Sequence, residues 1–158
     1  MPLLKKIRIL IIFFMIVLVL SGLTAMPAET LLHWLLQYKD MMPGKLANWL
    51  QTCYEALADT NNKYPFLAYG FDWLGFAHFA IALSFIGPYR DPVKNAWIID
   101  WQLIICILVI PLALIAGTIR QLPNFHIIID CCFGLFGIIP LLICRKWIKQ
   151  LAAINKTT

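Results

Sequence analysis

Hydrophobic residues fall into four long blocks separated by short polar segments. Each block has the length of an apolar helix that crosses a bilayer, about 20 residues, and its apolar positions do not alternate with polar ones. The pattern predicts four transmembrane helices. We expect them at residues 9–25, 66–87, 97–118 and 125–144.

Residues 27–64 between the first two blocks show a different pattern. Pro27 suits the first turn of a helix, and apolar side chains recur at helical spacing, although too many polar residues intervene for a span. The pattern predicts two short amphipathic helices, around residues 28–38 and 45–58, followed by a turn at residues 59–65. Trp and Tyr side chains favour the headgroup zone, so we place the helices on the outer face of the membrane; a packed hairpin outside the membrane is the alternative.

Composition supports a membrane protein. The chain is 61% hydrophobic and only 13% charged, with a mean hydropathy of +0.79, which does not describe a soluble domain. The net charge is +5, and the basic residues that produce it flank the hydrophobic blocks instead of forming a basic helix. This argues against a nucleic-acid partner.

Basic residues also predict the orientation. One side of the four spans carries Lys5, Lys6, Arg8, Arg90, Lys94, Arg145, Lys146, Lys149 and Lys156, and the other carries Lys39, Lys45, Lys63 and Arg120. The excess of Lys and Arg belongs in the cytoplasm. We therefore expect a multipass protein of the inner (cell) membrane with both termini cytoplasmic and residues 26–65 on the outer side.

The first block also resembles a secretory signal, because cations precede a short apolar core. Leu23, two residues before Ala25, is not small, so a cleavage site is poorly formed and we predict a retained anchor. A cleaved signal would leave three spans. The expected fold is an all-α integral membrane protein, one domain over residues 1–158, with a four-transmembrane-helix bundle and two short amphipathic helices on its outer face.

Ionisable residues inside the spans indicate where function lies, since such residues are costly in a bilayer. Asp72 and Asp130 lie at a similar depth, roughly 9 Å and 8 Å below the outer ends of their helices. His126 shares a helix face with Asp130, and Arg120 lies on the adjoining outer loop. The sequence predicts an outer-leaflet cluster of these four residues.

Two interpretations of the cluster stay open. Arg120 pairs with the aspartates and fixes helix register, or the residues line a wet site that opens outward. In the second case Asp72, Asp130 and His126 are the catalytic candidates, and Arg120 receives an anionic group such as a lipid phosphate. Trp73 and His33 are the further substrate-binding candidates. A divalent metal held by the histidine and carboxylates is a weaker alternative.

His78 lies near mid-membrane and is the candidate cofactor ligand, for haem or near a quinone. His126 is too shallow and His33 lies outside the spans, so two histidines of one chain cannot sandwich a haem. The simpler interpretation is an imidazole hydrogen-bonded between helices. No cofactor is predicted. Asp100, near the inner end of its span, is expected to pair with Arg90, Lys94 or Arg145.

Three function classes follow. The first is a structural or accessory membrane protein, including one subunit of a larger membrane complex. The second is an outer-leaflet enzyme or binder of a lipid or another amphiphile, and the third is a haem- or quinone-binding redox subunit. The expected partners are the lipid bilayer and either other membrane subunits or further copies of the chain. Whether the chain is an enzyme stays open.

Overall fold

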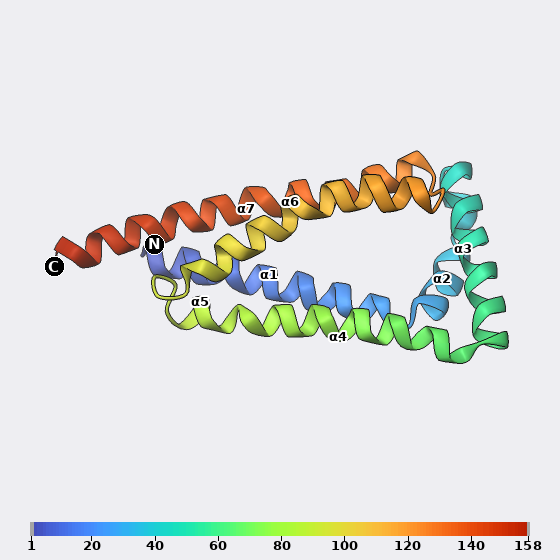
Figure 1. Cartoon of the computed structure of the whole chain (residues 1–158), viewed down its shortest axis with the longest axis horizontal. Coiled ribbons are helices and arrows are strands. Elements are labelled where there is room, and N and C mark those ends of the chain that lie inside the picture. The colour runs from blue at the N-terminus through green and yellow to red at the C-terminus, as the bar shows by residue number, and fades with distance from the viewer. Residues whose placement is uncertain (1, 158) are drawn as a thin grey trace. The chain divides into compact units, whose positions relative to one another are not determined.

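The computed structural model describes residues 2–157, and helices make up 88% of the chain. No strand occurs among the described residues, so the all-α prediction is confirmed. Figure 1 labels the seven α-helices: α1 (Leu3–Ala25), α2 (Ala28–Leu36), α3 (Gly44–Lys63), α4 (Tyr69–Ser84), α5 (Ile86–Arg90), α6 (Ala96–Ile119) and α7 (Asn124–Thr157). Two short 3₁₀ helices, η1 (Lys39–Met41) and η2 (Pro65–Ala68), come before and after α3.

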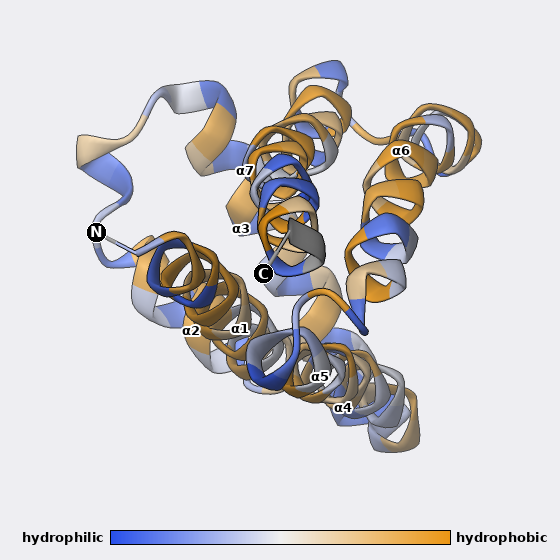
Figure 2. Cartoon of the chain, turned by 90° about the vertical axis from the view of Figure 1, so that its left-hand side faces the viewer, coloured by the Kyte–Doolittle hydropathy of each residue, from blue (hydrophilic) through white to orange (hydrophobic). Residues whose placement is uncertain are grey.

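Four helical segments of the described chain are long and apolar enough to cross a membrane: Leu3–Ala25, Pro65–Arg90, Ala96–Ile119 and Asn124–Asn155. Each contains one of the predicted spans. Hydrophobic residues cover much of these helices (Figure 2). The first helix begins earlier than the predicted span and the last ends later, because hydropathy marks where the apolar block stops and not where helical hydrogen bonding stops.

The chain divides into two compact units, Met15–Leu83 and Met1–Phe14 with Ser84–Thr158. The division falls within α1 and at the end of α4. The expectation of a single domain stays a prediction, and each unit is described by itself.

In the unit Met15–Leu83, α1 and α4 cross at two glycines. A Cβ on Gly22 would lie 2.8 Å from the carbonyl oxygen of Gly75, and a Cβ on Gly75 would lie 2.8 Å from that of Gly22. Two helix backbones can approach this closely only where side chains are missing, which is the usual role of small residues between membrane helices. The crossing therefore depends on both glycines.

The helices α2 and α3 of the same unit form an antiparallel hairpin. Asn61 donates a hydrogen bond of 2.6 Å to Glu29, and the rings of His33 and Tyr54 lie 5.6 Å apart, so residues early in α2 meet residues late in α3. The predicted turn at residues 59–65 was wrong over its first part, since α3 continues to Lys63. An ion pair of 2.8 Å from Lys63 to Asp59 joins successive turns there. Tyr64 then leaves the helical conformation, as the residue before a proline tends to do.

The other unit is built on the α6–α7 hairpin, whose helices lie side by side (Figure 1). A Cβ on Gly134 would lie 2.5 Å from the carbonyl oxygen of Cys106, and one on Gly137 would lie 2.8 Å from the Cys106 sulfur. A Cβ on Gly117 would lie 2.8 Å from Ile127 nearer the turn. The glycines hold the two helices close along the hairpin.

The core of this unit collects side chains from α1, α5, α6 and α7. The fully buried residues are Ile7, Ile11, Phe85, Pro88, Ile99, Leu141, Cys144 and Ile148. Phe14 stacks on Phe85 with ring centroids 5.8 Å apart. Pro88 separates α4 from α5, because it has no amide to donate to the carbonyl of Ser84. The first turns of α1 are thereby packed into the unit that contains α6 and α7.

Candidate functional site

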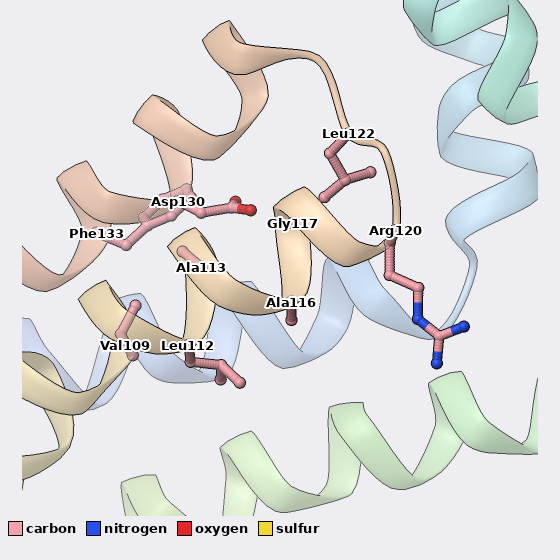
Figure 3. A pocket seen from close by; sticks show the side chains of 9 residues that line it. All are labelled: Val109, Leu112, Ala113, Ala116, Gly117, Arg120, Leu122, Asp130 and Phe133. Atoms are coloured by element: carbon pink, nitrogen blue, oxygen red, sulfur yellow. The ribbon is translucent and has the colours of Figure 1, made fainter.

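A pocket of about 300 Å³ lies between α6 and α7, beside the turn that joins them (Figure 3). Its walls are apolar except for Arg120 and Asp130, two residues of the predicted cluster. The other lining residues are Val109, Leu112, Ala113, Ala116, Gly117, Leu122 and Phe133. An apolar pocket with a few charged groups is a common form of binding site for an amphiphilic molecule.

Asp130 pairs with His126 one helical turn away. The imidazole Nε2 lies 3.7 Å from the carboxylate, and the two side chains are 38% and 35% exposed. The prediction that these residues share one face of the helix is confirmed. The pair is only partly buried, and Asp130 stays accessible from the pocket.

Arg120 and Asp130 do not form an ion pair, although both line the pocket. The Arg120 side chain points away from Asp130 and extends beyond the end of α6 (Figure 3). The pairing of Arg120 with Asp130, one form of the first interpretation, is therefore not formed within this unit, and a pairing with Asp72 stays a prediction. Arg120 keeps a free guanidinium within this unit, and Asp130 has the histidine instead.

The end of α6 fixes the position of Arg120. The amide of Leu122 donates to the carbonyl of Gly117 at 2.9 Å, and the amide of Gln121 donates to that of Thr118 at 3.1 Å. This is the Schellman pattern that ends many helices, with Ile119 as the last helical residue and Arg120 as the C-cap. Gln121 has a φ of 57°, which turns the chain so that Leu122 comes to lie over the pocket.

Asp72 and Trp73 belong to the other unit, near the start of α4, and both are exposed. The Trp73 ring makes edge contacts with Tyr69 and Phe76, at centroid distances of 6.0 and 5.7 Å. Within one unit the structure thus brings together Arg120, His126 and Asp130. That Asp72 and Trp73 belong to the same site as these three residues stays a prediction.

His33 lies on the face of α2 that meets α3, where its ring contacts Tyr54. Glu29 on the same face accepts the hydrogen bond from Asn61 and lines a small pocket of about 190 Å³ within the unit. The predicted substrate-binding role of His33 stays untested, and its observed contacts are those of a helical hairpin.

His78 is half-buried in α4. Its Nδ1 lies 2.8 Å from the carbonyl oxygen of Leu74, a separation at which Nδ1 carries the proton. The Nε2 atom then holds the lone pair. Among the described residues, no group of three or more His, Cys, Asp or Glu side chains could hold a metal ion.

A second polar group lies on α6 and α7 at the ends away from the turn that joins them. Arg145 donates a hydrogen bond of 2.5 Å to Asp100, one of the three pairings that the sequence predicted. Gln102 lies two residues further along α6 and is only 7% exposed, and its Oε1 atom has no hydrogen-bond partner. Sequence reasoning missed Gln102; the available signal was an amide side chain inside an otherwise apolar segment.

Burial raises the pKa of the Cys53 thiol in α3, outside the four candidate spans. The cause is loss of water around the thiolate, which disfavours the charged form. Cys53 is therefore less reactive than an exposed cysteine.

No protein-family model matches this chain, and no curated protein or solved structure matches it either, so its function has to be argued from the residues and contacts described above.

Proposed function

We propose that this chain is a small multipass inner-membrane protein of structural or accessory type, acting as one subunit of a larger membrane complex. One observation carries the proposal. No more than 22% of any of the four candidate spans is buried within the chain, so most of each apolar helix is left for lipid or for another protein. Membrane helices that pack so little against their own chain offer wide surfaces to partner helices.

The polar side chains support the same proposal, because most of them have local partners. Arg145 forms an ion pair with Asp100, and His126 lies at ion-pair distance from Asp130. His78 lies at hydrogen-bond distance from the carbonyl of Leu74. The Asp100–Arg145 contact joins two helices and the other two lie within one helix, so all three are accounted for by structure alone. Basic residues are concentrated within residues 3–8 and 145–149. Because Lys and Arg are more frequent on the cytoplasmic side of a membrane protein, this supports cytoplasmic termini and an outer position for residues 26–65.

The test is extraction of the natural membrane in a mild detergent, followed by capture of the tagged full chain and native mass spectrometry. We expect a stable complex with other membrane subunits or further copies of the chain at a fixed stoichiometry. A chain that appears only as a monomer under several mild detergents contradicts the accessory role, while its extraction behaviour still reports whether it is an integral membrane protein.

The pocket between α6 and α7 favours a second function, an outer-leaflet binder of, or enzyme acting on, an anionic amphiphile. The apolar walls suit an acyl chain, the unpaired Arg120 suits its anionic group, and Asp130 with His126 supplies a carboxylate and a base at the side. Asp72, Trp73 and His33 lie in the other unit, and their part in such a site stays a prediction.

Binding of a fluorescent fatty acid to the purified chain tests this second function. The substitution Arg120→Gln removes the positive charge. It should lower the affinity for the fatty acid about tenfold, since a charge-assisted hydrogen bond is lost. The matched control is Arg90→Gln at the opposite end of the helices. Equal affinity of the wild-type chain and Arg120→Gln would exclude this role for the pocket.

A third function, a haem or quinone redox subunit, is favoured only by His78. The proton on Nδ1 leaves the Nε2 lone pair as a ligand for iron, and a backbone carbonyl fixes the ring as in many metal sites. An absorbance spectrum of the chain purified after expression with added haem tests the haem form. A Soret band that is lost in His78→Ala supports it, and a colourless preparation excludes it.

A further inference from the structure

A groove of about 460 Å³ lies within the unit Met1–Phe14 with Ser84–Thr158, at the predicted cytoplasmic ends of two helices. Its α1 wall consists of Lys6, Ile9, Leu10 and Phe13, and Trp147 of α7 closes one end. The α1 residues are spaced at i, i+3, i+4 and i+7, so they form one continuous face of the helix. The groove thus has a charged and aromatic end and an apolar remainder.

This face of α1 does not pack against the chain. Ile7 and Ile11, on the other side of the helix, are fully buried, whereas Ile9 and Phe13 are 51% and 54% exposed. The inner turns of α1 are therefore fixed by one face while the groove face stays open. A molecule that fills the groove would meet a preformed surface.

The charged end of the groove lacks a neutralising carboxylate. The Lys6 ammonium lies over the Trp147 ring, 5.9 Å from its centroid, and Lys5, Lys146 and Lys149 are exposed nearby along the sequence. The acidic residues of this unit are Asp91, Asp100 and Asp130, and none of them lies within ion-pair distance of these four lysines.

Two of the other cations at this end, Arg145 and Arg8, are already engaged, and Lys6 is the cation among the residues that line the groove. Arg145 binds Asp100, and Arg8 donates to the carbonyl of Tyr89 at 3.1 Å while its guanidinium lies 5.4 Å from the Tyr89 ring. Lys6 is thus the cation at the groove that is left to bind an anion. A Trp at headgroup depth beside it adds an indole N–H donor.

We propose that this groove binds one anionic phospholipid of the cytoplasmic leaflet, with its phosphate at Lys6 and Trp147 and an acyl chain along Ile9, Leu10 and Phe13. The proposal rests on the membrane orientation proposed above. Acyl chains are already in apolar surroundings in a bilayer, so the apolar wall gives shape but little preference. Selectivity comes from the headgroup charge. A second copy of the chain docked by the same groove would bring two cationic ends together.

Native mass spectrometry of the full chain in detergent, titrated with phosphatidylglycerol or phosphatidylcholine of matched acyl chains, tests the proposal. We expect one phosphatidylglycerol to bind at least fivefold more tightly than phosphatidylcholine. Lys6→Gln should lower its affinity about fivefold, the effect of one cation near an anionic surface, and Lys6→Arg should retain it. The control Lys45→Gln, in α3, should have no effect.

Brominated phosphatidylglycerol quenches the fluorescence of tryptophans that it contacts, and so locates the bound lipid. If the lipid lies in this groove, Trp147→Phe should remove part of that quenching. Equal affinity for the two lipids, an equal loss in Lys45→Gln, or full competition by glycerol phosphate alone would overturn the proposal. A dimer that forms in place of lipid binding would overturn it in favour of a second copy. Carbonate extraction of membranes reports insertion separately, so failure of lipid binding and failure of the proposed membrane location are distinguishable.

Discussion

Gln121 occupies a backbone conformation that glycine adopts far more readily. Its φ of 57° lies in the left-handed region, where the Cβ of an ordinary residue crowds the following carbonyl at a cost of roughly 1–2 kcal/mol. The Schellman hydrogen bonds at the end of α6 hold it there, and Leu122 over Gly117 supports the turn.

Gln121→Gly should therefore raise the free energy of unfolding by about 1 kcal/mol. The measurement is thermal unfolding in detergent followed by circular dichroism. Gln37→Gly is the matched control, because Gln37 ends α2 with a φ of −63°, where glycine only adds entropy to the unfolded chain. A loss of stability in both variants would show that the turn does not strain Gln121.

Gln102 presents a buried acceptor without a donor, which is costly in an apolar core. Gln102→Leu should leave stability unchanged or raise it by up to about 1 kcal/mol, since the unpaired oxygen is removed and the volume is similar. The exposed Gln150→Leu is the control for an added leucine. A clear loss of stability in Gln102→Leu alone would mean that the amide has a partner in the membrane.

At the scale of elements, Gly134 sets the separation of α6 and α7. A methyl group there would lie 2.5 Å from a backbone carbonyl oxygen, which cannot rotate away, so the helices must move apart. Gly134→Ala should lower the stability of the hairpin by about 1–3 kcal/mol, the usual effect of overpacking, as measured by the same unfolding experiment.

Gly70→Ala is the matched control, because nothing lies within 4 Å of a Cβ at that position in α4. There we expect no loss, and a gain of up to about 1 kcal/mol from helix propensity. Similar destabilisation by both substitutions would contradict the close helix contact at Gly134.

The elements were largely predictable, and their ends were not. Four apolar blocks predicted the four candidate spans, because hydropathy over about 20 residues is a strong signal. The polar ends of α1, α3 and α7 escaped prediction because Lys, Arg, Gln and Asn continue a helix as readily as they end an apolar block. Helix boundaries depend on individual backbone hydrogen bonds, such as the one from Leu122 to Gly117 at the end of α6, and the hydropathy of a segment does not reveal them.

The candidate site was predictable in part. Depth along two helices predicted Asp72 and Asp130 at one level with Arg120 on the adjoining loop, and of these residues Arg120 and Asp130 do line one pocket. The direction of the Arg120 side chain depends on the turn at Gln121. A left-handed residue at this position is usually a glycine, and because it is a glutamine here, the sequence did not indicate the turn. The groove of Lys6 and Trp147 joins residues from the two ends of the sequence, a pairing that needs the packing of α1 beside α7.

At the scale of the whole molecule, Cys53 reports the orientation of the chain. In a variant whose other cysteines are replaced by alanine, a membrane-impermeant maleimide should label Cys53 in intact cells, because residues 26–65 are proposed to face outward. The raised pKa keeps the thiol protonated to higher pH than an exposed cysteine. Labelling should therefore be slow near pH 7 and continue to accelerate above the ordinary thiol pKa.

Lys149→Cys in a background that also lacks Cys53 is the control for the opposite side. It should be labelled only after the membrane is permeabilised, since the end of α7 is proposed to be cytoplasmic. The reverse pattern, with Cys53 protected and position 149 labelled in intact cells, would contradict the orientation while leaving the helical assignment intact.

The length of α7 has a mechanical consequence. One continuous helix of 34 residues contains both the span predicted at residues 125–144 and the more polar segment from Arg145 to Thr157, with no loop between them. At about 1.5 Å per residue the segment beyond the span is a lever of about 20 Å, so a tilt of about 10° in the span moves its tip by about 3 Å. Pro140 removes one backbone hydrogen bond inside α7, so bending is easiest there, and the helix beyond Pro140 moves as one piece. Events on the outer side of the hairpin would then be felt as displacement at the far end of α7.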